Sequence, residues 1–204
     1  MCHKLEARFF RELGSLDPAE VCRRALCRYD RDRECYLLEA WAGEYEIHPG
    51  RAEIRSGSSG VLPVTIEAGL SIIFYLLRSR DIPLRNEWIS EKDLPGGLTF
   101  FRGPHAVPAR LIAQRFANDR EGFKNACRGR GGKPLDLGRA AYEFRILPRV
   151  PAAVLFWEAD QEFEAQARLL FDRTISFHLP LDVIFGLSVE TCERIASGAI
   201  SPVP

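Results

Sequence analysis

The chain has 204 residues, which is long enough to bury one sizeable hydrophobic core. Its hydrophobic content of 46% and charged content of 27% are ordinary for a globular protein and exclude a disordered or fibrous chain. Lys plus Arg and Asp plus Glu number 28 each, so there is no net basic charge to attract nucleic acid or an anionic membrane surface.

The first residues lack the apolar stretch of a signal peptide. The longest apolar runs, residues 68–77 and 150–157, fall well short of the roughly 20 residues that cross a bilayer. We therefore expect a soluble cytoplasmic protein with no membrane or nucleic-acid partner. Six cysteines in such a protein are expected to stay reduced. The only cluster, Cys22, Cys27 and Cys35, matches no zinc or ferredoxin spacing, so we interpret these residues as buried structural cysteines.

The N-terminal half begins with a helix start, because Asp17 can cap a helix and Pro18 suits its first position. Strands are predicted at residues 34–42, 44–49 and 51–56. The segment SGSSG, residues 56–60, is a flexible turn that is either a lid or a plain connection. A helix capped by Thr65 follows, and it is apolar on most sides, which predicts a place deep in the core.

Residues 86–105 are predicted as a loop with a sharp break at Pro95-Gly96-Gly97. Helices over 106–119 and 121–129 follow, and then a glycine-rich basic loop over 128–138. An alternating strand is predicted at 142–148 and a continuous apolar strand at 152–157. Residues 163–171 fit either a helix or a strand. The β-branched and aromatic residues that follow favour a turn after Asp160 and a returning strand over 168–179.

A final helix over 179–196 completes the predicted elements. Together they indicate an α+β fold, a mostly antiparallel sheet with helices packed against it in a single domain. We expect residues 1–14 to be an N-terminal extension, residues 15–198 to form the domain, and residues 199–204 to be a C-terminal tail.

Four segments resemble a prokaryotic family known as domain of unknown function 3786. They are EWISEKDLPGG, LPRVPAAVLFWEADQEF, LLFDRTISFHLPLDVI, and the helix GLSIIFYLL before Pro83. The resemblance covers roughly residues 15–198. It implies a setting in anaerobic prokaryotes and, because some members carry an additional cysteine-rich iron–sulfur domain, an iron–sulfur protein as a possible partner. This sequence contains no four-cysteine cluster, and the resemblance implies no catalytic residues.

The first candidate site is an acidic strip. Glu158, Asp160 and Glu162 alternate, so in an extended chain their carboxylates share one face, and Asp172 follows downstream. Crowded carboxylates raise one another's pKa or attract a divalent cation, which would suit general acid/base or metal chemistry. The alternative is a charged turn between two apolar strands, or an ion pair with Arg149 or Arg173.

The second candidate site combines the segments FFRGPHAVPAR, residues 100–110, and CRGRGGKP, residues 127–134. Positive charge near their glycines comes from Arg102, Arg110, Arg128, Arg130 and Lys133. Glycines let backbone N–H groups approach an anion, although the spacing is not that of a P-loop. His105 precedes a helix and could donate a hydrogen bond there. The alternative is a solvated basic loop. The residues that we expect to bind a ligand are Trp88, Gly96, Gly97, Arg102, Gly131, Gly132, Arg149 and Trp157.

Two further features leave alternatives open. In a strand, Asp172, Thr174, Ser176 and His178 would share a face, as a pocket wall or as a solvent-facing edge. Trp88 and Trp157 are either the walls of a flat pocket or core residues.

The sequence therefore favours a binding module for a small anionic or flat metabolite, or for a redox partner in anaerobic metabolism. The alternative is an enzyme with Glu158, Asp160, Asp172 and His105 as catalytic candidates. No metal is expected, with Glu158, Asp160 and Glu162 as weak candidates, and no cofactor is identified.

Overall fold

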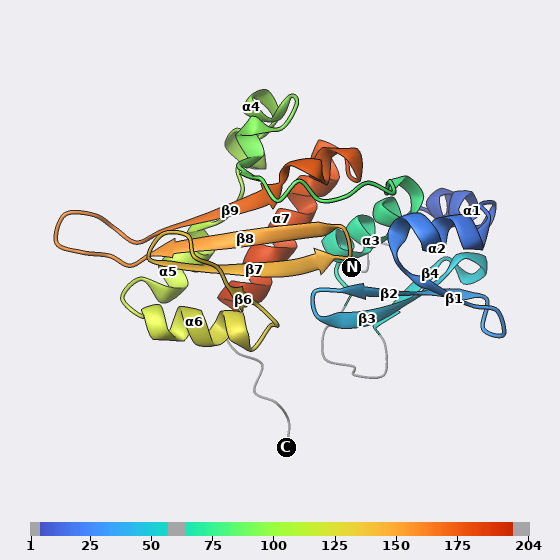
Figure 1. Cartoon of the computed structure of the whole chain (residues 1–204), viewed down its shortest axis with the longest axis horizontal. Helices are drawn as coiled ribbons and strands as arrows, with labels where there is room; N and C mark the ends of the chain where they lie inside the picture. Colours follow the sequence, from blue (N-terminus) through green and yellow to red (C-terminus); the bar gives the residue numbers. More distant parts are fainter. Residues whose placement is uncertain (1–4, 57–63, 198–204) are drawn as a thin grey trace, which may run out of the picture.

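The computed structural model describes residues 5–56 and 64–197. Within them the chain forms two antiparallel sheets and seven α-helices, which confirms the α+β class, with two sheets where one was expected (Figure 1). The first sheet has the order β1-β2-β3-β4 and the second the order β5-β9-β8-β7-β6. Most of the predicted SGSSG turn lies outside the described residues.

The N-terminal part builds the first sheet and two helices beside it. Helix α1 spans Ala7–Gly14 and α2 spans Pro18–Ala25, with the Asp17 side chain accepting the Ala19 N–H as predicted. Phe10 and Leu13 of α1 are buried in the core, so the predicted extension contributes to the folded body. The strands of this sheet are β1 (Arg28–Asp30), β2 (Cys35–Ala40), β3 (Gly43–His48) and β4 (Glu53–Ser56).

Helix α3 (Ile66–Arg78) lies at the centre of the molecule, beside the C-terminal helix α7 (Leu181–Ala196). The Thr65 side chain accepts the Ala68 N–H and caps α3, as the sequence predicted. Ile72, Ile73 and Leu76 are fully buried, which fits the apolar character of the helix on most sides.

The second sheet is formed by β5 (Trp88–Ile89), β6 (Lys133–Pro134), β7 (Ala140–Leu147), β8 (Val150–Trp157) and β9 (Gln166–Asp172). Helices α5 (Arg110–Phe116), α6 (Arg120–Arg128) and α7 cover one of its faces (Figure 1). Phe123 of α6 stacks on Phe156 of β8 and meets Tyr142 of β7 edge to face. The helices and both sheets thus share one hydrophobic core.

The predicted strand over 168–179 is wrong in its second half. Strand β9 ends at Asp172, and a 3₁₀-helix, η4 (Arg173–Phe177), follows. The reason is local, because the Asp172 carboxylate accepts the Thr174 N–H and hydroxyl and so caps the turn. Asp172, Thr174 and His178 are buried, so the solvent-facing alternative for these residues is wrong.

The predicted loop over 86–105 contains short elements. They are β5, two 3₁₀-helices, η2 (Glu91–Asp93) and η3 (Gly103–His105), and helix α4 (Gly97–Phe100). A Cβ atom at Gly97 would lie 2.0 Å from the backbone oxygen of Glu91, so this turn needs glycine for packing. Among the described residues, no helix is long and apolar enough to cross a membrane.

Candidate ligand-binding cavity

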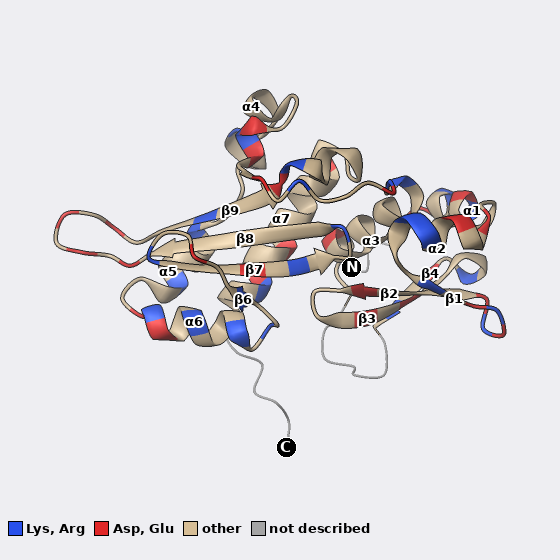
Figure 2. Cartoon of the chain, in the orientation of Figure 1, with Lys and Arg blue, Asp and Glu red and all other residues tan. Residues whose placement is uncertain are grey.

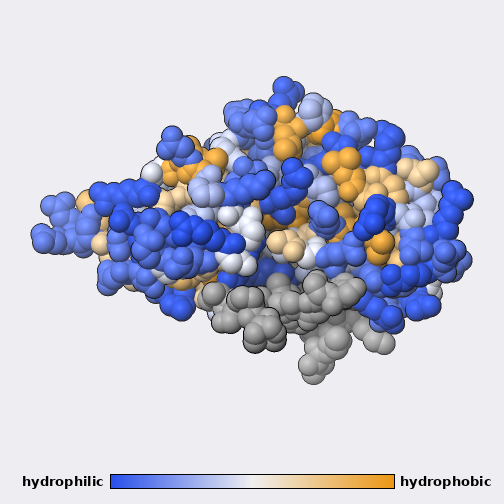
Figure 3. Space-filling view, turned by 60° about the horizontal axis from the view of Figure 1, so that its bottom comes forward, coloured by the Kyte–Doolittle hydropathy of each residue, from blue (hydrophilic) through white to orange (hydrophobic). Residues whose placement is uncertain are grey.

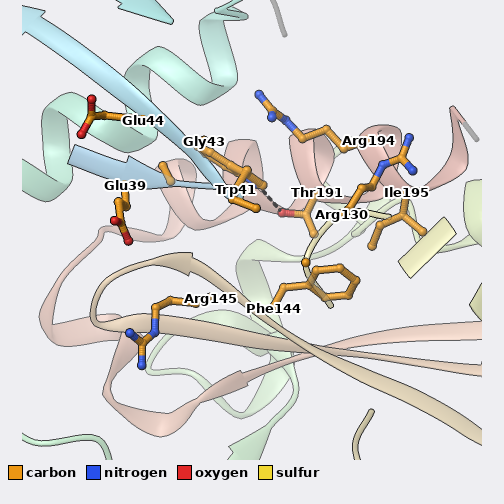
Figure 4. A pocket seen from close by; sticks show the side chains of 13 residues that line it. Glu39, Trp41, Gly43, Glu44, Arg130, Phe144, Arg145, Thr191, Arg194 and Ile195 are labelled. Carbon is orange, nitrogen blue, oxygen red and sulfur yellow. Dashed lines mark hydrogen bonds between the residues drawn. The ribbon is translucent and has the colours of Figure 1, made fainter. Parts of the chain in front are cut away.

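A cavity of about 350 Å³ opens where the β2–β3 turn of the first sheet meets strand β7 and helix α7 (Figure 4). Its walls are mostly apolar, which is typical of sites for small organic molecules. Four parts of the chain that are far apart in sequence supply the lining: residues 39–44, Arg130 with Gly131, Phe144 with Arg145, and Thr191 with Arg194 and Ile195.

The turn that forms one wall of this cavity is strained. Ala40 pairs with Gly43, so Trp41 and Ala42 form a two-residue hairpin turn, with φ of 46° and 60°. Such left-handed turns favour Asn-Gly, and a non-glycine residue there costs about 1 kcal/mol or more. Backbone strain of this kind persists only where the surroundings impose it, and it clusters at functional sites.

Three contacts hold Trp41 in its position. Its backbone N–H donates to the Ile146 oxygen of β7 at 2.9 Å, which links the two sheets at the turn. Its indole Nε1–H donates to the Thr191 hydroxyl at 3.1 Å, drawn as a dashed line in Figure 4. The guanidinium carbon of Arg194 lies 4.9 Å from its ring centroid, a cation–π distance. The aromatic wall is therefore fixed by both sheets and by α7.

Arg194 is itself part of a buried network. Its Nε donates to the Glu190 carboxylate one turn earlier in α7, and its Nη2 donates to the Tyr45 hydroxyl at 3.0 Å. Glu190 also accepts the hydroxyl of Thr65, the cap of α3. Arg194 Nη1 is buried without a hydrogen-bond partner among the described residues. Because Glu190 neutralises Arg194 and Trp41 lies against the guanidinium, this arginine supports the wall rather than offering a free charge to the cavity.

Charged side chains lie at the rim. Figure 4 shows Arg130 and Arg145 pointing outward from the apolar centre rather than toward one another. Arg130 donates to the Ala126 oxygen and to the Ser197 hydroxyl, both at 3.2 Å, and burial lowers its pKa. Arg145 is exposed. The cavity thus combines an apolar interior with cationic groups at its edge.

The glycine-rich basic loop predicted from sequence lies partly at this cavity. Gly131, with φ of 75°, is part of the lining, and a Cβ atom there would lie 3.1 Å from the Ala42 Cβ atom. Gly132 packs behind it, because a Cβ atom there would lie 2.8 Å from the Phe144 ring. Both glycines allow the close approach of this loop to the walls of the cavity.

The other predicted segment, residues 100–110, lies elsewhere, as do the expected binding residues Gly96 and Gly97. Gly96 precedes α4 and Gly97 is its first residue, and this helix projects from the body above β9 in Figure 1. Arg102 Nε donates to the Leu98 oxygen at 2.7 Å, and exposed His105 stacks on the Phe100 ring at 4.7 Å. The structure does not bring Gly96, Gly97, Arg102 or His105 to the Trp41 cavity.

The acidic strip lies in the connection between β8 and β9, residues 158–165, which projects from the molecule and carries several acidic residues, coloured red in Figure 2. Asp160 accepts the backbone N–H groups of Glu162 and Phe163, and these bonds lower its pKa. A second hollow of about 330 Å³ lies at its base, beside Trp157 and Glu158. Figure 3 shows a mostly hydrophilic surface on this projecting end. No three His, Cys, Asp or Glu residues in the described part of the chain are grouped to hold a metal ion.

Asp172 lies at the opposite end of β9, about 20 Å from the strip at the rise of an extended strand. It pairs in register with Trp88 of β5. Its carboxylate accepts the N–H groups of Arg85 and Asn86 as well as the N–H and the hydroxyl of Thr174. Burial alone would raise the pKa of Asp172, but these hydrogen bonds together lower it. The structure therefore does not bring Glu158, Asp160 and Asp172 into one cleft.

Arg149 joins distant segments of the fold. Its Nε donates to the Arg24 oxygen at 2.8 Å, its Nη1 to the Ile82 oxygen at 3.0 Å, and its Nη2 to the Asp81 carboxylate at 2.5 Å. All three donor nitrogens are thus engaged within the protein.

Trp88 and Trp157 pack on the outer face of the second sheet, around Ala153 and Leu155.

Sequence reasoning missed Trp41, Thr191 and Arg194. The only local signal is at Trp41 and Ala42, just before Gly43. These two residues occupy the positions of a two-residue turn that favours Asn-Gly. Thr191 and Arg194 carry no signal in the sequence, since they read as ordinary polar positions of an amphipathic helix.

The fold and the cavity define an α+β protein in which two antiparallel sheets meet at a hairpin turn that forms a wall of a small, mostly apolar cavity. The chain belongs to the family described as a domain of unknown function, DUF3786, whose model matches residues 17–194. No curated protein and no solved structure matches the chain.

Proposed function

We propose that the protein is a small-molecule-binding module and that the Trp41 cavity is its site. The observation that carries the proposal is the strained turn. Two consecutive left-handed residues, an indole hydrogen bond and a cation–π contact all serve to hold one aromatic ring at the wall of an apolar cavity. A fold gains nothing from such strain unless the position of the ring matters.

The lining indicates the chemical class of the ligand. Trp41 and Phe144 offer aromatic surface, which favours a flat, largely apolar molecule. The exposed Arg145 at the rim favours an anionic group at the edge of that molecule, such as a carboxylate, sulfonate or phosphate. The ligand class is therefore a flat metabolite or cofactor fragment with a negative charge at one end.

Anilinonaphthalene sulfonate is a suitable first probe, since it combines an aromatic body with one anionic group. We expect the folded protein to bind it at one saturable site, measured by the rise in probe fluorescence. Trp41→Ala should abolish this site, and Arg145→Ala should weaken binding by roughly tenfold, the effect of about 1.4 kcal/mol. Trp157→Ala, on the outer face of the second sheet, is the matched control and should bind normally.

Binding that survives unchanged in Trp41→Ala, or the absence of any saturable site, would overturn the proposal. Near-ultraviolet circular dichroism of each variant separates loss of the site from loss of the fold. Native mass spectrometry of protein purified without oxygen then tests for a natural ligand, which should be present in wild type and Trp157→Ala and absent from Trp41→Ala.

The enzyme alternative requires the acidic residues to converge, and the described residues do not support it. The expected iron–sulfur protein partner and the anaerobic setting stay predictions from the family resemblance.

A further inference from the structure

Two thiols lie in contact at the end of helix α2. The sulfur atoms of Cys22 and Cys27 are 3.8 Å apart, with the Cys27 thiol donating to the Cys22 sulfur. Both residues are partly exposed, whereas Cys35, Cys127 and Cys192 are buried. Among the cysteines that the structure describes, this pair is therefore the one that a small reagent reaches first.

The contact follows from how the helix ends. Leu26 is left-handed, with φ of 52°, and the N–H groups of Leu26 and Cys27 both donate to the Cys22 oxygen. This is the hydrogen-bond pattern of a helix C-terminus that folds back on its last turn, and it places the residue after the cap over the last turn. The contact between these two positions is ordinarily apolar, but here both positions carry thiols.

We propose that Cys22 and Cys27 form a redox-active dithiol site, which a small-molecule disulfide oxidises to an intramolecular disulfide bond. A disulfide needs the sulfur atoms at about 2.05 Å, so they must approach by less than 2 Å. The backbone reversal that brings the residues together is already present, so rotation of the two side chains supplies this movement. The site is independent of the proposed cavity.

The chemistry is a two-step exchange. The Cys22 thiolate attacks one sulfur of the small disulfide, and the other half leaves as a thiolate. The Cys27 thiolate then attacks the Cys22 sulfur of this mixed disulfide, and the second small thiolate leaves. The protein loses two electrons and the small disulfide gains two, while the two thiol protons of the protein end on the released small thiols. Cys22 is the first nucleophile because the hydrogen bond from Cys27 stabilises its thiolate.

The surroundings of the two thiols slow their oxidation but favour the disulfide at equilibrium. Burial raises the pKa of both thiols, and the proximity of Cys22 raises that of Cys27 further. Few thiolates are therefore present near neutral pH, and oxidation should be slow and become faster as the pH rises. Because burial outweighs the hydrogen bond from Cys27, neither thiolate of the reduced pair is stabilised on balance, so the disulfide should persist once it has formed.

The sequence allows a direct test, because Arg23 and Arg24 lie between the two cysteines. The fully reduced, folded chain is incubated with oxidised glutathione, free thiols are alkylated, and trypsin cleaves after both arginines. A disulfide then links the peptide of residues 12–23 to that of residues 25–28. We expect this linked pair in wild type, its loss on reduction, and a faster yield at alkaline pH.

Two variants complete the experiment. Cys35→Ser, which removes a neighbouring buried thiol, should still give the linked peptides. Cys22→Ser should not, and its Cys27 should at most carry a single glutathione. The proposal is overturned if folded wild type leaves both cysteines alkylated, or if Cys22 or Cys27 links to another cysteine instead. Circular dichroism before alkylation establishes that the chain is folded in each case.

Discussion

Lowering the pH should destabilise the protein through one buried imidazole, that of His178. Only 1% of His178 is exposed. Its Nδ1 accepts the Arg80 N–H at 3.2 Å, and its Nε2 is buried with no hydrogen-bond partner among the described residues. Burial, and then the nearby charges of Arg149 and Arg80 against that of Asp172, lower the pKa of His178 from 6.5 to about 4. The ring is therefore neutral at pH 7.

The sign of the effect follows from proton uptake. As the pH falls, the unfolded chain binds a proton at His178 before the folded chain does, so the unfolded state is favoured. The contribution of His178 to stability is fully present above about pH 6.5 and is lost as the pH falls toward about 4. Each pKa unit corresponds to about 1.36 kcal/mol, which gives a loss of about 3 kcal/mol in all, of which about 2 kcal/mol is lost by about pH 5.

Urea unfolding at about pH 7.5 and about pH 5, analysed as a two-state transition, measures this loss. His178→Asn is the informative variant, because the Asn side-chain oxygen can still accept the Arg80 N–H but does not titrate. We expect wild type to lose about 2 kcal/mol more than this variant between the two pH values. His105→Asn, at an exposed histidine, should lose as much as wild type. Equal losses in wild type and His178→Asn would refute the reasoning.

Three further perturbations test the packing around the sites. Ala42→Gly should raise the free energy of unfolding by about 0.5–1 kcal/mol, because glycine adopts the left-handed conformation without a clash. A lower free energy of unfolding, measured in urea, would contradict the inference that Ala42 is strained. Asp172→Ala should cost about 3 kcal/mol, since it leaves buried N–H groups without their acceptor, while Asp160→Ala on the projecting connection should cost under about 0.5 kcal/mol. Because the pKa of Asp172 is lowered on folding, its contribution should be present above about pH 4 and lost in stronger acid. Glu190→Gln should lower the free energy of unfolding by about 3 kcal/mol, because it leaves the Arg194 charge buried without its counter-ion. Adding Arg194→Met should restore part of this stability. If thermal unfolding shows no such recovery, Glu190 and Arg194 are not energetically coupled.

Much of the fold could be predicted because its signals are local. Asp17 and Thr65 cap the helices that follow them, and each cap needs only a side chain and an N–H group two or three residues away. The hairpins of both sheets follow from short runs of strand-forming residues with turns between them. The end of β9 could not be predicted in this way, because residues 173–177 favour strand by composition while the Asp172 cap folds them into a 3₁₀-helix.

The sequence by itself determined the α+β class, the family and most of the helices and strands, since these depend on interactions within a few residues or on motifs that can be read directly. Only the tertiary structure decided the site. Strand β9 separates Asp172 from the acidic strip, and all the donor nitrogens of Arg149 form hydrogen bonds within the protein. Gly131 lies in the same cavity lining as Trp41 and Arg194. The physical reason is that a cavity forms where segments distant in sequence pack against each other, and no local pattern specifies which side chains will face it.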